Sequence, residues 1–196
     1  MRNVLLTYLA LGWSIAATAG CPVELVSTPT GAAQALMISK LTPLMACQVG
    51  DPLSDKSPCN VFVGKGLDEV YSISDFKTAD GYLAANRIAD SIAIDARWVK
   101  LGKVFDEGNN LCAQALANNA YPVIAVEKAT GNGHVALVIP GEPAKSSSWG
   151  MFVANSASFF IDNPTKGYVS APLSKAFSAQ NAQAAVFFYR KPSGSL

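Results

Sequence analysis

Residues 121–141 read YPVIAVEKATGNGHVALVIPG, and this stretch decides the fold class. Tyr121 to Glu127 and His134 to Ile139 are both rich in β-branched residues, which favour strands. Gly131-Asn132-Gly133 lies between the two runs and is typical of a turn, and Pro140-Gly141 ends the second run. Two such runs joined by a short turn predict neighbouring antiparallel strands.

The segments outward from this hairpin complete the expected order of elements. Helical composition is found over residues 31–47, where Pro43 should end or kink the helix, and over 80–96 and 106–119. Further strands are expected over 151–160 and 184–189. Helices that precede a run of strands with short turns predict an α+β domain, with N-terminal helices packed on an antiparallel sheet.

The first 20 residues have the pattern of a signal peptide. Arg2 supplies the positive start, Val4 to Ala17 form the apolar stretch, and Ala17-Thr18-Ala19 is a small-x-small cleavage site. We therefore expect export to the periplasm or the extracellular space, with residues 21–196 as one domain. Thr18-Ala19-Gly20-Cys21 also resembles a lipoprotein cleavage motif, but Thr18 stands where that motif usually has Leu, so membrane attachment through Cys21 is the less favoured alternative.

Composition favours a compact globular protein and excludes one class of partner. Half of the residues are hydrophobic, 15% are charged, and the formal net charge is +1. The sequence contains no dense block of Lys and Arg. Nucleic-acid binding therefore has no electrostatic basis in this chain.

The four cysteines are Cys21, Cys47, Cys59 and Cys112. Export permits disulfides, but a catalytic Cys59 would have to stay free. Lipidation of Cys21 would leave Cys47 and Cys112 as a pair; without it, Cys21 could pair with Cys47 and leave Cys112 buried in its helix. With no CxxC spacing and a single histidine, we expect no zinc site.

Cys59 is the candidate nucleophile. The loop over 48–56 is followed by Ser57, a good N-cap, and Pro58, which suits the first helical position, so Cys59 should fall in the first turn of a helix. Unpaired backbone N–H groups and the helix dipole there favour the thiolate and can stabilise an oxyanion. An inert buried or disulfide-bonded cysteine is the alternative. Gly64 and Gly66 within the same helix suggest a close approach by neighbouring backbone.

His134 is the candidate general base, because it is the only histidine and opens a strand directly after the turn. Its alternative is a structural role. A third group should orient the imidazole. The next strand offers Asn155, Ser156 and Ser158, of which we choose Asn155; Asp51 and Asp55 are outside candidates.

These residues resemble the motifs of a known superfamily. Ser57-Pro58-Cys59-Asn60-Val61-Phe62-Val63 resembles the nucleophile motif of NlpC-type and CHAP-type cell-wall cysteine peptidases, and Gly133-His134-Val135-Ala136-Leu137-Val138 resembles their histidine motif. The likeness is closest to the type VI secretion amidase effectors. It extends over residues 57–160 and includes three further stretches in the same order: 98–101, 113–117 and 122–125.

The resemblance implies a papain-like fold and a Cys-His pair without a metal or cofactor. It implies cleavage of an amide in the peptide stem of peptidoglycan, the bond between γ-D-glutamate and diaminopimelate in the closest relatives, and an immunity-type inhibitor protein as a partner. The expected signal peptide departs from those effectors, which leaves two alternatives: a wall-remodelling enzyme of the cell's own envelope, or a captured effector gene re-equipped for export. The alternatives are an N-acetylmuramoyl-L-alanine amidase and a catalytically idle envelope binding protein or lipoprotein.

Overall fold

The computed structural model describes residues 21, 31–48 and 61–192. The expected signal peptide over residues 1–20 and the candidate residues Asp51, Asp55 and Cys59 lie outside the described residues. The helices are α1 (Gly31–Leu41), η1 (Thr42–Gln48), α2 (Phe62–Tyr71), α3 (Ala85–Ile94), α4 (Glu107–Asn118), η3 (Pro164–Lys166), η4 (Leu173–Lys175) and α5 (Ala179–Ala184). The strands are β1 (Lys77–Thr78), β2 (Gly81–Tyr82), β3 (Trp98–Lys103), β4 (Val123–Glu127), β5 (His134–Val138), β6 (Ala144–Lys145), β7 (Phe152–Val153), β8 (Asn155–Ser158), β9 (Tyr168–Pro172) and β10 (Val186–Arg190).

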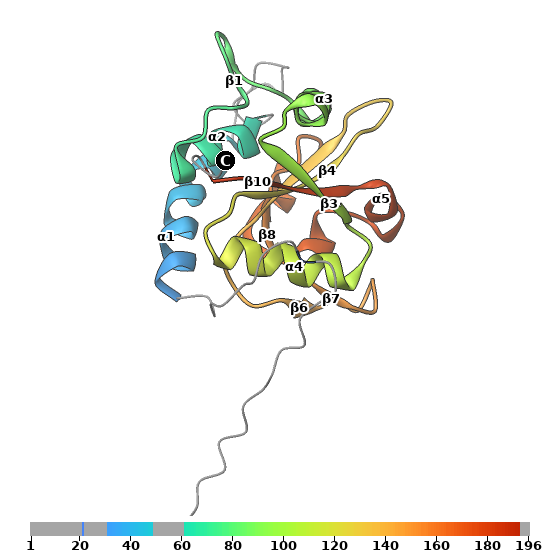
Figure 1. The fold of residues 1–196 in the computed structure, drawn as a ribbon. Helices are drawn as coiled ribbons and strands as arrows, with labels where there is room; N and C mark the ends of the chain where they lie inside the picture. Colours follow the sequence, from blue (N-terminus) through green and yellow to red (C-terminus); the bar gives the residue numbers. More distant parts are fainter. Residues whose placement is uncertain (1–20, 22–30, 49–60, 193–196) are drawn as a thin grey trace, which may run out of the picture.

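A six-stranded sheet in the order β3-β10-β4-β5-β8-β9 organises the fold (Figure 1). All of its neighbouring strands are antiparallel. The β4–β5 hairpin is present as expected, and its register pairs Val123 with Val138 and Glu127 with His134. Two short hairpins, β1-β2 and β6-β7, stand apart from this sheet. The expected α+β class with an antiparallel sheet is confirmed.

Both faces of the sheet are covered, so successive residues of β5 enter different cores. Ala136 and Val138 face the core formed with α4 and α5. Leu137 and Ile139 face the other core, to which α1, α2 and α3 contribute. Figure 1 shows α1 beside α2, with α4 running separately along the sheet. A strand buried on both faces is apolar at nearly every position, which explains the HVALVI run.

A polar stripe on α4 secures the chain where strands end. Asn110, Gln114 and Asn118 follow one another at intervals of four residues, the spacing that places side chains on one helix face. The Asn110 Oδ1 accepts from the backbone N–H of Ala154 at 3.1 Å. The Gln114 amide accepts from Asn155 N at 2.6 Å and donates to Ile139 O at 3.0 Å. Buried amides thus bond backbone groups at the ends of strands.

The helix boundaries differ from the expected ones in an informative way. α1 ends at Leu41 and continues as η1, which fits the expected effect of Pro43. α2 begins at Phe62 with Val61 as its N-cap. The helix start expected at Ser57 and Pro58 lies outside the described residues and stays a prediction. Without a Ser, Thr, Asp or Asn side chain at Val61, this N-terminus has no side-chain cap.

The glycines of α2 accommodate side chains rather than backbone. A Cβ on Gly64 would lie 3.1 Å from the Tyr82 Cβ, and a Cβ on Gly66 would lie 2.9 Å from a Leu41 methyl carbon. The expected close approach is therefore present, but its partner is different. These contacts press α2 against α1 and against β2.

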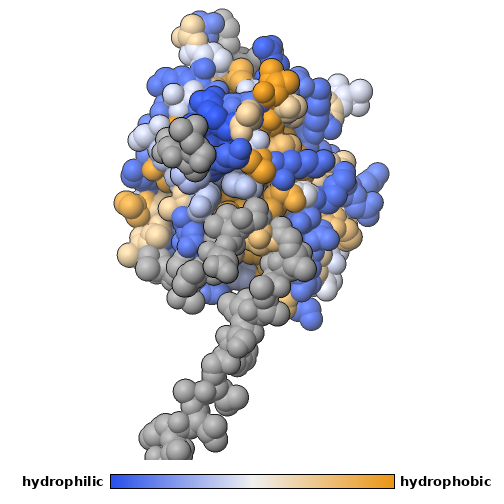
Figure 2. All heavy atoms as spheres, viewed as in Figure 1, coloured by the Kyte–Doolittle hydropathy of each residue, from blue (hydrophilic) through white to orange (hydrophobic). Residues whose placement is uncertain are grey.

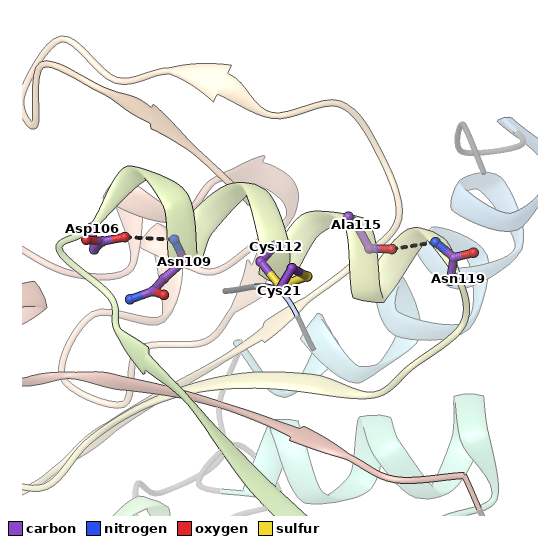
Figure 3. Close-up of a disulfide and its surroundings, with 6 residues drawn as sticks. All are labelled: Cys21, Asp106, Asn109, Cys112, Ala115 and Asn119. Atoms are coloured by element: carbon purple, nitrogen blue, oxygen red, sulfur yellow. Dashed lines mark hydrogen bonds between the residues drawn. A yellow bond between two sulfur atoms is a disulfide. The ribbon is translucent and has the colours of Figure 1, made fainter. Parts of the chain in front are cut away.

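The cysteine pairing is a correction to both alternatives weighed above. Cys21 and Cys112 form a disulfide with a Cα–Cα distance of 5.5 Å and a sequence separation of 91. Figure 3 shows Cys112 midway along α4, between the Asp106 cap at one end of the helix and Asn119 at the other. Cys112 is buried, as the alternative without lipidation expected, but its sulfur is bonded to Cys21 and not free. A sulfur so bonded cannot carry a lipid thioether.

The described surface gives no indication of a membrane span. None of the described helices is both long and apolar enough to cross a bilayer. In the view of Figure 2, hydrophilic and hydrophobic residues are interspersed. The exposed large hydrophobic residues of the described chain, Leu36, Ile94 and Phe152, come from three different elements.

Candidate functional site

A cavity of about 550 Å³ lies at the end of the sheet where the β4–β5 turn precedes His134. Its walls come from the start of α2, the start of α3, the β4–β5 turn, the chain between β8 and β9, and the segment that leads into α5. Among the lining residues are Phe62, Val63, Asn86, Glu127, His134, Phe160, Asp162, Lys166, Lys175 and Asn181.

His134 occupies the first position of β5 and is held by three side chains. Its Nε2 lies 2.8 Å from the Ser158 Oγ. The imidazole stacks on Phe160 with ring centroids 4.8 Å apart and an interplanar angle of 18°. The Phe177 ring meets it edge-on at 5.1 Å. This packing fixes the orientation of the imidazole.

The surroundings of His134 favour its neutral form. Burial lowers the pKa of His134 to about 4, because the charged imidazolium loses hydration among the aromatic rings. At neutral pH the ring therefore has one N–H donor and one acceptor nitrogen. When Nε2–H donates to Ser158, the Nδ1 lone pair is free to take a proton, as a general base requires.

The structure does not bring Asn155 to His134. Asn155 lies at the far end of the β5–β8 pairing, where its backbone O accepts from Ile139 N at 3.0 Å. Its side chain is buried, donates to Pro140 O at 3.0 Å and accepts from Ser170 Oγ at 3.3 Å. Ser158, another of the three polar residues considered on this strand, is the one that contacts the imidazole. Ser156 instead contacts Tyr168 and Ala171.

Cys59 lies outside the described residues, but the residues that follow it can be placed. Phe62 and Val63, the first residues of α2, line the same cavity as His134. The His134 ring, however, packs against Phe177, which belongs to the α4 side of the sheet, whereas Phe62 and Val63 belong to the opposite core. The cavity at the end of the sheet is therefore lined by residues from both sides of the sheet.

Several cavity residues were not anticipated from the sequence. Glu127 is the cross-strand neighbour of His134, and its Oε2 accepts from the Asn181 Nδ2 at 3.1 Å. Asp162, Lys166 and Lys175 add charges of both signs to the cavity wall. Asn86, on α3, bonds the turn before His134. No local pattern marks these residues, because only the folded sheet brings them together.

Within residues 21, 31–48 and 61–192, no group of three or more His, Cys, Asp or Glu side chains could hold a metal ion. No protein-family model matches this chain, and neither does any curated protein sequence.

Proposed function

We propose that this chain is an exported cysteine hydrolase of papain-like (NlpC-type) fold that cuts an amide bond in the peptide stem of peptidoglycan. One observation supports this most strongly. The cavity at the end of the sheet is lined both by His134 and by the residues that follow Cys59 at the start of α2. A nucleophile and its base have to share such a cavity.

In the proposed reaction, the Cys59 thiol gives its proton to His134 and the thiolate attacks the amide carbonyl carbon. The tetrahedral intermediate collapses as the imidazolium protonates the leaving amine, and a thioester remains on Cys59. His134 then takes a proton from water, and the resulting hydroxide attacks the thioester carbonyl. The C–S bond breaks to release the carboxylic acid, and the imidazolium returns its proton to the departing Cys59 sulfur, which restores the free thiol and the neutral imidazole. Ser158 is the geometric choice for the group that orients the imidazole, in place of Asn155.

The charges of the cavity fit a stem peptide. Lys166 and Lys175 can face carboxylates, and Glu127 and Asp162 can face an ammonium group. Diaminopimelate carries both kinds of group, and D-glutamate carries a carboxylate. The proposed bond is accordingly the one between γ-D-glutamate and diaminopimelate.

The disulfide supports the export part of the proposal. A bond between Cys21 and Cys112 requires an oxidising compartment, such as the periplasm or the cell exterior. It also occupies the Cys21 sulfur, which argues against a lipid anchor at this residue.

The test is to incubate the mature protein and its Cys59→Ala variant with purified peptidoglycan and to identify the released fragments by mass spectrometry. We expect new ends between D-glutamate and diaminopimelate with the unmodified protein alone. Cys47→Ala is the matched control and should retain activity. Stems that begin with L-alanine would move the assignment to an N-acetylmuramoyl-L-alanine amidase, and equal release by Cys59→Ala would remove Cys59 from the mechanism.

One observation favours a second candidate, a catalytically idle envelope binding protein. The imidazole packs between two phenylalanine rings on the face opposite α2, an environment that also suits a structural histidine. Thiol alkylation rates separate the candidates. A catalytic Cys59 should react more slowly in His134→Gln than in the unmodified protein, because the base is lost. Equal rates together with no fragment release would establish the idle protein.

A further inference from the structure

The turn between β4 and β5 is held by a side chain from another element. Asn86, the second residue of α3, donates from its Nδ2 to Ala129 O at 3.0 Å and to Gly131 O at 2.7 Å. Its Oδ1 accepts from Ala129 N at 3.2 Å. The side-chain amide thus uses both of its donor hydrogens and an acceptor lone pair on one turn.

These bonds replace those that a tight turn would make within itself. Among the described hydrogen bonds, none joins two backbone groups within residues 128–133. A turn without internal backbone bonds has to satisfy its polar groups by other contacts. Asn86 supplies three of these contacts.

The same contact excludes any side chain from the residue before His134. A Cβ on Gly133 would lie 2.3 Å from the Asn86 Oδ1 and 2.6 Å from the Glu127 backbone oxygen. Asn86, Glu127 and Gly133 are therefore in close contact directly before β5, and no side chain fits on Gly133. The backbone position of His134 depends on this packing, because His134 is the next residue and pairs with Glu127.

We propose that Asn86 is a positioning residue for His134: its amide fixes the β4–β5 turn and thereby the place of the imidazole in the cavity. Its consequence for catalysis rests on the proposed function, but its effect on His134 does not. Asn86 acts through the backbone of the turn, and no contact between its side chain and the imidazole is needed.

The chain offers a matched control at the other end of the same strand. Asn118 bonds the segment after β5 in the same way, by donating to Gly141 O at 3.1 Å and accepting from Gly141 N at 2.9 Å. Asn86→Ala and Asn118→Ala each remove an amide that holds one end of β5. Of the two residues, only Asn86 bonds the turn at the end of β5 that carries His134.

The experiment compares the two variants by NMR of the imidazole and by kinetics on stem peptides. With a single histidine in the chain, the imidazole signals belong to His134 without ambiguity. We expect Asn86→Ala to shift these signals, to move the pKa of His134 from about 4 toward 6.5, and to lower kcat roughly 10- to 100-fold. We expect Asn118→Ala to lower the melting temperature without changing the signals or kcat.

Asn86→Asp and Gly133→Ala are second variants in case Asn86→Ala does not fold. The first keeps the size of the side chain and loses both donors, and the second keeps Asn86 but displaces the turn; both should shift the His134 signals. Wild-type signals and kcat in a folded Asn86 variant, or an equal shift in Asn118→Ala, would overturn the inference. A wild-type protein that releases no fragments would refute the proposed function instead, while the NMR comparison would still test Asn86.

Discussion

His134 should lower the free energy of unfolding at low pH. Its pKa lies near 4 in the folded protein and near 6.5 in an unfolded chain. Both states are neutral above pH 6.5, but as the pH falls toward 4 only the unfolded chain takes up the proton. The free energy of unfolding should therefore fall over this window, by about 3 kcal/mol in total.

The measurement is urea unfolding at pH 7 and pH 4, made in the Cys59→Ala background to remove any coupling to the thiol. His134→Gln in the same background lacks the titrating group and should lose less stability between the two pH values. The carboxylates contribute equally to both proteins, so the difference isolates the imidazole. An identical pH dependence would show that His134 is hydrated in the folded state.

The hydrogen bond between Ser158 and the imidazole of His134 can be tested by mutation. Ser158→Ala should lower kcat/KM roughly 10- to 100-fold, because the hydrogen bond that orients the charged ring is worth about 1.5–3 kcal/mol. Asn155→Ala should lower stability instead, since its side chain bonds Pro140 and Ser170.

Kinetic assays and melting curves of both variants decide between the two residues. Ser156→Ala, two positions from Ser158 on the same strand, is the matched control for loss of a serine hydroxyl and should retain its kcat/KM. The reverse ranking, with Asn155→Ala the less active variant, would restore Asn155 as the orienting group.

The position of His134 at the start of a strand can be predicted from the sequence, but its hydrogen-bond partner cannot. The only histidine, directly after a glycine turn, could be placed at the start of a strand from local pattern alone. The choice among Asn155, Ser156 and Ser158 depends on how their strand is paired with its neighbour. A shift of one residue in this register moves every side chain of the strand to the other face of the sheet. The structure pairs Ala136 with Ser158, which places that hydroxyl beside the imidazole.

Among the helices, α4 is the one in which loss of a polar side chain should lower the free energy of unfolding most. Gln114→Met keeps the approximate size of the side chain but removes its hydrogen bonds to Asn155 N and Ile139 O. Both backbone groups would stay buried without a partner. We expect the free energy of unfolding to fall by about 2–4 kcal/mol.

Denaturant unfolding measures this loss against Gln183→Met, which makes the same chemical change at an exposed position of α5. That control should change stability by less than about 0.5 kcal/mol. Equal stability of the two variants would mean that water reaches the freed backbone groups.

Elements with strong local signals were predicted well and the others were not. The helix expected over 106–119 agrees with α4, because the Asp106 side chain caps it by accepting from Asn109 N at 2.8 Å. β3 and β9 were not expected. β3 carries lysines and a glycine, and β9 contains Ser170 at positive φ and ends at Pro172. Pairing with β10 and β8, rather than local propensity, makes them strands.

For the molecule as a whole, the α+β class can be predicted from the sequence. Which segments cover each face of the six-stranded sheet cannot. The six-stranded sheet joins β3 to β10 at one edge, so its core depends on contacts between distant segments. Asp75 strengthens that edge: its carboxylate lies 2.6 Å from the Arg190 Nε and accepts from the Trp98 Nε1 at 3.1 Å. Neither pairing has a local signature, and the disulfide partner of Cys21 has none either.

The disulfide supplies the last prediction, because it joins Cys21 to α4 across 91 residues of chain. Closing a loop of this length restricts the unfolded chain, and loss of such a bond typically costs about 2–5 kcal/mol. A reducing agent should therefore lower the midpoint of denaturant unfolding of the mature protein. The same agent should leave a Cys21→Ala/Cys112→Ala variant unchanged, since that protein lacks the bond under either condition. Intact mass spectrometry of the protein isolated from its native cells is an independent measurement. A lipid on Cys21 would add mass and exclude the disulfide, and finding it would refute both the pairing and the unanchored state proposed above.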